Sequence, residues 1–223
     1  CSVLLPPQME PRPVDTTAIE PKESLIQRAT SVFMRLGVRA VNMADLSSEL
    51  GISKKTLYKY VSDKRDLILQ CMAWHCSQME HVIEEAKATS ENTIEAELKL
   101  IRFIHQITSD MHPSVLFDLN KYHPKAFRFV NDRRDEILRG TMEENIRRGQ
   151  AEGVYRDDVN PEVASRLLIG LSHEVRAMAE DTAVSIPLSQ LYLESALYHI
   201  RAIATAKGIA FLEEKIKEEN LFT

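Results

Sequence analysis

The chain has 223 residues, of which 44% are apolar and 27% charged, as expected for a globular protein of one large domain or two small ones. No apolar run approaches the roughly eighteen residues needed to span a bilayer, and the three cysteines lack the spacing of a disulfide framework. These features exclude a membrane-spanning protein and a disulfide-stapled secreted domain, and they indicate the reducing cytoplasm.

Residues 1–20 are predicted to be a disordered arm, because they carry no periodic apolar pattern. Together with Pro21, this stretch contains five of the nine prolines of the chain. A basic arm can enter a minor groove, but the single Arg12 gives that hypothesis little support. A plain disordered leader is the favoured interpretation.

The first predicted helix spans about residues 22–36. Its apolar residues recur at steps of three and four: Leu25, Ile26, Ala29, Val32, Phe33 and Leu36. Gly37 follows them and is expected to end the helix. The apolar stripe is expected to cover the elements that come next.

Two short helical patterns separated by Gly51 follow. Asn42 is the expected N-cap of the first, with Asp45 at its third helical position. Ser53 repeats the arrangement for the second, with Thr56 at the third position. Glycine favours the sharp turn between them because it tolerates positive φ. Two helices joined by a short turn that contains glycine form a helix-turn-helix unit.

The second of these helices, predicted over residues 54–61, carries a cationic face. Leu57 and Val61 are four apart and are expected to face the core. The remaining surface holds residues suited to phosphates and base edges in a major groove, namely Lys54, Lys55, Tyr58 and Lys59. A plain solvated charged face is the alternative. The capped turn upstream favours DNA binding, because it would present the helix.

The charge distribution supports the same interpretation, although the net charge is −5. Residues 20–66 carry nine Lys and Arg against six Asp and Glu, whereas residues 67–223 carry a net charge of −7. A small cationic module on an acidic body directs phosphate binding to one end of the molecule.

The run GISKKTLYKYVSDKRDL, which begins at Gly51, resembles the signature of TetR-type (tetracycline-repressor-like) regulators. The shared positions are Gly51, Ile52, Ser53, Thr56, Leu57, Tyr58, Tyr60, Lys64 and Leu67. The chain departs from the family pattern at Ser47, Lys55 and Val61. These departures leave the base preference open. The resemblance implies that Tyr58 and Lys64 contact DNA phosphates.

Pattern and resemblance together give nine candidate DNA-contacting residues: Asn42, Ser53, Lys54, Lys55, Thr56, Tyr58, Lys59, Tyr60 and Lys64. The resemblance further implies an all-α regulator, most commonly a repressor. Such a protein binds palindromic double-stranded operator DNA as a homodimer and is released by a small-molecule inducer. The helix-turn-helix DNA-binding domain is assigned to residues 21–66, and a helical bundle for ligand binding and dimerisation to residues 67–223.

The rest of the chain shows only helical patterns. They are expected at about residues 63–88, 92–109, 113–121, 124–152, 161–181, 188–207 and 209–220. Pro113, Pro124 and Pro161 each lie at or beside a helix start, where a missing N–H costs nothing. Gly208 is expected to end the helix before it.

Two of these helices, about 161–180 and 188–207, are apolar on more than one side. A helix that is apolar all round must be buried on two sides. We therefore predict that these helices form a homodimer interface of four helices. The alternative is that they are central core helices of a monomer. A two-fold DNA reader also needs two half-site helices, which favours the dimer.

The resemblance also implies an inducer pocket among the later helices. Ten candidate lining residues are Met72, Trp74, His75, Met79, Phe103, His105, Met111, Phe117, Tyr122 and His173. Most apolar residues in helical stripes are ordinary core residues, so fewer than about half of the ten are expected to touch a ligand.

Other chemistry finds little support in the sequence. No nucleotide-binding glycine loop, nucleophile elbow or zinc-finger spacing occurs. Cys71 and His75 are four apart on one predicted helix, but two ligands do not make a metal site. No metal, cofactor or catalytic residue is predicted, and the chain is not expected to be an enzyme. The alternative function is a helical scaffold whose helix-turn-helix binds protein rather than DNA.

Overall fold

The computed structural model describes residues 22–180 and 185–219, and it contains no strand within these ranges. The helices are α1 (Lys22–Leu36), α2 (Met43–Leu50), α3 (Lys54–Leu57), α4 (Lys64–Thr89), α5 (Thr93–Ser109), α6 (Ser114–Tyr122), α7 (Pro124–Ala151), α8 (Pro161–Glu180), α9 (Leu188–Ile203) and α10 (Ala206–Glu219). The predicted all-α class is confirmed. The predicted arm, residues 1–20, lies outside the described residues.

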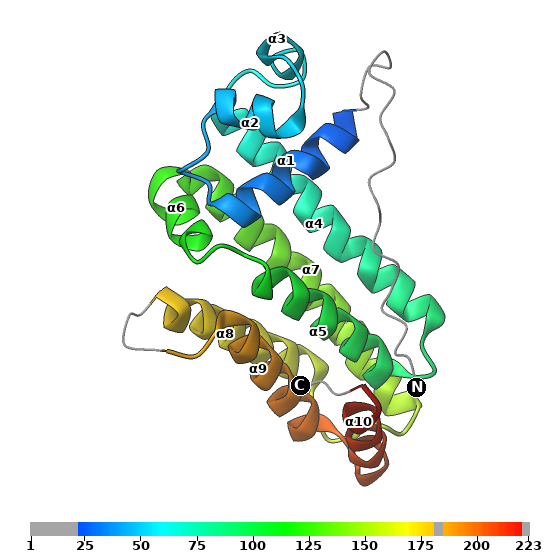
Figure 1. Ribbon diagram of the computed structural model, residues 1–223. Coiled ribbons are helices and arrows are strands. Elements are labelled where there is room, and N and C mark those ends of the chain that lie inside the picture. The colour runs from blue at the N-terminus through cyan, green and yellow to red at the C-terminus, as the bar shows by residue number, and fades with distance from the viewer. Residues whose placement is uncertain (1–21, 181–184, 220–223) are drawn as a thin grey trace.

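The helices form two regions joined by one long helix (Figure 1). Helices α1–α3 lie at one end, and α4 runs from them along the length of the molecule. Helix α4 packs against α5 and α7, while α8 and α9 pack on the opposite side of those two helices. No described helix is long and apolar enough to cross a membrane.

The helix-turn-helix does not have a core of its own. Phe33, Leu46 and Leu57 are buried in one cluster that also contains Leu67 of α4 and Leu119 of α6. Three short helices bury too little surface to be stable alone, so α4 and α6 complete their packing. The proposed division of the chain at residue 66 therefore passes through a continuous core.

The predicted helix 188–207 is wrong at its C-terminal end. Helix α9 ends at Ile203, because Ala204 adopts an extended conformation and pairs with Tyr155 as an isolated bridge. Gly208 does not end α9 but lies in the first turns of α10. A Cβ there would lie 2.2 Å from the carbonyl oxygen of Val154, so close packing explains this glycine.

Candidate DNA-binding surface and ligand cavity

The predicted double cap of the helix-turn-helix is present. Asn42 Oδ1 accepts hydrogen bonds from the backbone N–H groups of Ala44 (2.7 Å) and Asp45 (3.1 Å), and Asp45 Oδ2 accepts from Asn42 N. Gly51 has φ 67°, in the left-handed region, and Ser53 Oγ accepts from Thr56 N at 3.0 Å. Local sequence thus fixes the turn that presents α3.

Helix α3 is shorter than the predicted helix over residues 54–61. Its α-helical part ends at Leu57, and the chain continues as a tighter turn. The N–H groups of Lys59 and Tyr60 reach back only three residues, to the carbonyls of Thr56 and Leu57, at 3.1 Å each. Leu57 and Val61 are buried as predicted, and they anchor this segment to the core.

Four of the nine candidate DNA-contacting residues form one exposed surface on this segment, which we call the cationic turn. They are Lys54, Lys55, Tyr58 and Lys59. Tyr58 is 50% exposed although it is a large aromatic residue. The structure presents the cationic turn at the end of the molecule farthest from α10 (Figure 1).

The other five candidates also have structural roles. Asn42, Ser53 and Thr56 form the caps, and Tyr60 packs against the core. Lys64 is half-buried, and its ammonium group lies 3.4 Å from the carbonyl oxygen of Arg39. Desolvation lowers the pKa of Lys64, and the nearby Asp118 and Asp45 oppose this effect.

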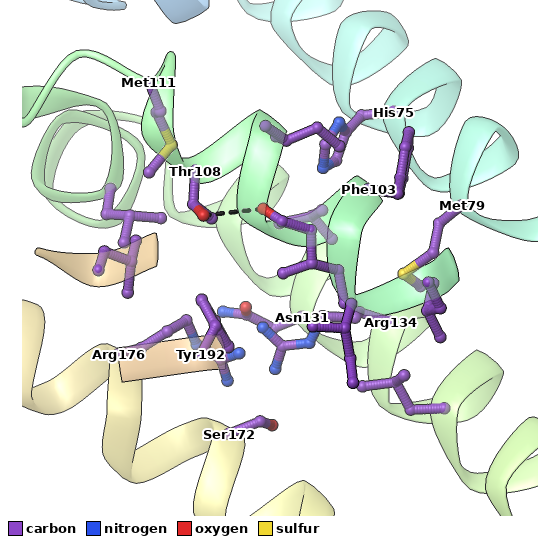
Figure 2. A pocket seen from close by; sticks show the side chains of 18 of the residues that line it. His75, Met79, Phe103, Thr108, Met111, Asn131, Arg134, Ser172, Arg176 and Tyr192 are labelled. Atoms are coloured by element: carbon purple, nitrogen blue, oxygen red, sulfur yellow. Dashed lines mark hydrogen bonds between the residues drawn. The ribbon is translucent and has the colours of Figure 1, made fainter. Parts of the chain in front are cut away.

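A cavity of about 180 Å³ lies among α4–α9. Its walls are mostly apolar, and Figure 2 shows the polar side chains that point into it. The polar lining residues are His75, Glu97, Thr108, Asn131, Arg134, Ser172, Arg176, Tyr192 and Ser195. A concave, mostly apolar site with a few polar groups is typical of a small-molecule pocket. Among the described residues, no group of three or more His, Cys, Asp and Glu could hold a metal ion.

Comparison with known proteins identifies the N-terminal region. Residues 25–71 match the family described as bacterial regulatory proteins, tetR family. This segment contains the caps and the cationic turn. The chain carries a TetR-family DNA-binding domain.

The described part of the chain also has the TetR-like fold, with a helical domain after the helix-turn-helix. A TetR-family regulator from Agrobacterium tumefaciens superposes with a TM-score of 0.64 at 15% identity, over 84% of this chain and 100% of that one. The ketosteroid transcriptional regulator KstR2 of Mycobacterium tuberculosis gives 0.53 at 16% identity, over 82% and 95%. A TetR-family regulator from Streptomyces coelicolor gives 0.57 at 18% identity, over 83% and 97%. No curated protein sequence matches the chain.

Five of the ten predicted pocket residues line the cavity of this TetR-like fold. They are Met72, His75, Met79, Phe103 and Met111. Burial lowers the pKa of His75, so its imidazole is neutral at physiological pH. We keep these five as proposed ligand contacts.

The other five predicted residues lie outside the cavity. Trp74 packs toward the core that α1 shares with α4. The exposed Phe117 and Tyr122 meet edge to face, with ring centroids 6.4 Å apart. His173 is exposed and contacts Asp135 at 2.6 Å. His105 belongs to α5, as do several residues that line the cavity. Its position around the helix places it outside the cavity lining.

Sequence reasoning missed three charged residues that do line the cavity: Glu97, Arg134 and Arg176. Burial raises the pKa of Glu97 to about 7, and the hydrogen bond that Tyr155 Oη donates to it at 2.8 Å acts in the opposite direction. The signal that could have found Glu97 is a carboxylate inside the apolar stripe of α5.

Proposed function

We propose that this chain is a ligand-responsive transcriptional regulator, acting as a repressor. It binds palindromic operator DNA as a homodimer and is released by a small-molecule inducer. The observation that carries the proposal is the cationic turn. Lys54, Lys55 and Lys59 are all exposed on a capped helix-turn-helix of the TetR family, where they are available to phosphates and base edges.

An apolar face on α8 and α9 supports the homodimer. It consists of Val163 (53% exposed), Leu167 (68%), Leu171 (38%) and Tyr198 (63%). The three α8 residues repeat at steps of four, so they lie along one side of the helix. Exposed apolar patches of this kind mark protein interfaces, and α8 and α9 are the helices that the sequence assigned to the dimer.

The structure offers a route from the cavity to the DNA-binding end. Arg39 N, in the loop before α2, donates a hydrogen bond to Asp118 Oδ2 of α6 at 2.9 Å. His112 N donates to the carbonyl oxygen of Met34 at 2.7 Å. Met34 and Leu116 line the cavity themselves. A ligand that displaced α6 would therefore move the helix-turn-helix, provided that it binds the two arrangements with different affinities.

Selection from a pool of randomised duplexes tests the function. The full chain, immobilised at low salt, should enrich a two-fold symmetric sequence with half-sites about one helical turn apart. Electrostatic attraction alone would retain duplexes without enriching any sequence. Absence of retention at low salt would instead favour the scaffold hypothesis, in which the helix-turn-helix binds protein.

The dimer makes a separate prediction. The double substitution Leu167→Glu and Tyr198→Glu should convert a dimer into a monomer of 25.4 kDa, because burying two unpaired carboxylates costs several kcal/mol. Sedimentation velocity measures the result. Leu69→Glu, on α4, is the matched control, since Leu69 is also exposed (40%) but lies outside the apolar face. A monomeric parent chain, or a double variant that stays dimeric, would contradict the interface.

A further inference from the structure

Two arginines in the cavity hold hydrogen-bond donors that no described residue satisfies. Arg176 of α8 is only 9% exposed, and its Nη1 is buried without a hydrogen-bond partner in the described part of the chain. Arg134 of α7 has a buried Nε in the same condition. Figure 2 shows both side chains converging on the middle of the cavity beside Asn131.

The two guanidinium groups place more positive charge in the cavity than the described side chains offset. An arginine side chain cannot neutralise itself by losing a proton, and an unpaired buried charge is costly. Arg134 Nη2 contacts Asp135 Oδ1 at 2.9 Å, so one of the two charges has a partner. Within residues 22–178 and 185–218, whose side chains the structure describes, no carboxylate forms an ion pair with Arg176. In this part of the chain the pair therefore carries about one unit of unmatched positive charge.

The remaining acidic residue of the cavity does not supply the missing partner. Glu97 is engaged with Tyr155 Oη at 2.8 Å, and burial raises the pKa of its carboxyl to about 7. In the described residues, Glu97 forms no ion pair with Arg134 or Arg176. The negative charge that matches the unpaired positive charge must therefore come from a ligand that enters the cavity.

Most of the rest of the cavity wall is apolar and deformable. It includes five methionines, Met34, Met72, Met79, Met111 and Met142. Methionine side chains adapt to ligands of irregular shape. A ligand for this cavity must then have a largely apolar body as well as an anionic end.

We infer that the cavity binds a monocarboxylic acid with an apolar body, whose two oxygens accept hydrogen bonds from Arg134 Nε and Arg176 Nη1. Two unsatisfied donors match the two oxygens of a carboxylate, and one unmatched positive charge matches a single negative charge. A phosphate monoester would bring a second charge and a third oxygen that the pair leaves unmatched. This inference rests on the proposed ligand-responsive function and names the chemical class of the ligand.

Calorimetric titration of the full chain without DNA tests the inference. The probes are matched pairs, octanoate with octanol and naphthoate with naphthylmethanol, together with octyl phosphate. At least one acid should bind about tenfold more tightly than its alcohol. Arg176→Met should weaken binding of that acid about 10- to 100-fold, the loss expected for a charged hydrogen-bond partner, and should leave alcohol binding unchanged.

The control is Arg166→Met on the same helix, because Arg166 is exposed and its Nη2 pairs with Glu162 Oε1 at 2.9 Å. It should leave acid binding unchanged. Arg176→Met should unfold at the same temperature as the parent or higher, since it removes an unpaired buried charge. Arg134→Met provides a second variant. The comparison of acids with alcohols is made on the parent chain and needs no variant.

Three results would overturn the inference: acids that bind no better than their alcohols, octyl phosphate that binds more tightly than octanoate, or acid affinity that survives Arg176→Met. Its failure is separable from failure of the regulator proposal. Acid binding that does not alter DNA affinity would count against regulation alone. DNA release by a ligand with no preference for acids would count against the carboxylate site alone.

Discussion

Replacing Lys54 and Lys59 by alanine should weaken binding to the selected operator about 10- to 100-fold near 0.1 M salt. It should also reduce the slope of log K against log salt by about two for each chain, or about four for a dimer. The physical reason is that each exposed lysine on a phosphate releases condensed counterions when it binds. In the described residues, the ammonium groups of Lys54 and Lys59 form no intramolecular ion pair, so they are available to phosphates.

Fluorescence anisotropy of a labelled duplex, measured over a series of salt concentrations, gives both quantities. The matched control is Arg139→Ala with Lys217→Ala, which removes the same charge from exposed positions on α7 and α10. The control should lose little affinity and keep the slope of the parent. If the Lys54 and Lys59 variant kept the parental slope, these lysines would not touch phosphates and the assignment of the cationic turn would fail.

Gly149→Ala should lower the free energy of unfolding by about 2 to 4 kcal/mol, as overpacking of a rigid site does. A Cβ at this position of α7 would lie 2.2 Å from Tyr155 Cδ2 and 2.8 Å from Thr93 Oγ1. Neither neighbour can move freely. Tyr155 is buried and donates to Glu97, and Thr93 Oγ1 donates to Glu152 at 3.0 Å.

The matched control is Gly140→Ala on the same helix, where an added Cβ meets nothing within 4 Å. That substitution should stabilise the protein by up to about 1 kcal/mol, because alanine is the better helix former. Urea unfolding at one fixed protein concentration compares the two, since dimerisation would make stability depend on concentration. Equal effects of the two substitutions would show that the contact between α7 and Tyr155 is not rigid.

Local sequence determined the helices and the turn that presents α3. The caps by Asn42 and Ser53, the left-handed Gly51 and the start of α7 at Pro124 all depend on interactions within about four residues, which a sequence pattern contains in full. The same reasoning placed the ends of most helices within a residue or two. It also identified the exposed lysines, because the burial of Leu57 and Val61 fixes which side of the segment faces outward.

Tertiary packing decided the rest. Helix α9 stops at Ile203 because the chain there pairs with Tyr155, almost fifty residues away, and no local signal marks that contact. Arg134 and Arg176 come together only because α7 packs against α8. In the sequence, a single arginine on each of these helices cannot be distinguished from an ordinary solvent-exposed charge. The sequence therefore specified the exposed cationic turn that we propose for DNA contact. The packing of α7 on α8 decided which side chains meet in the proposed ligand cavity, because distant side chains come together only after folding.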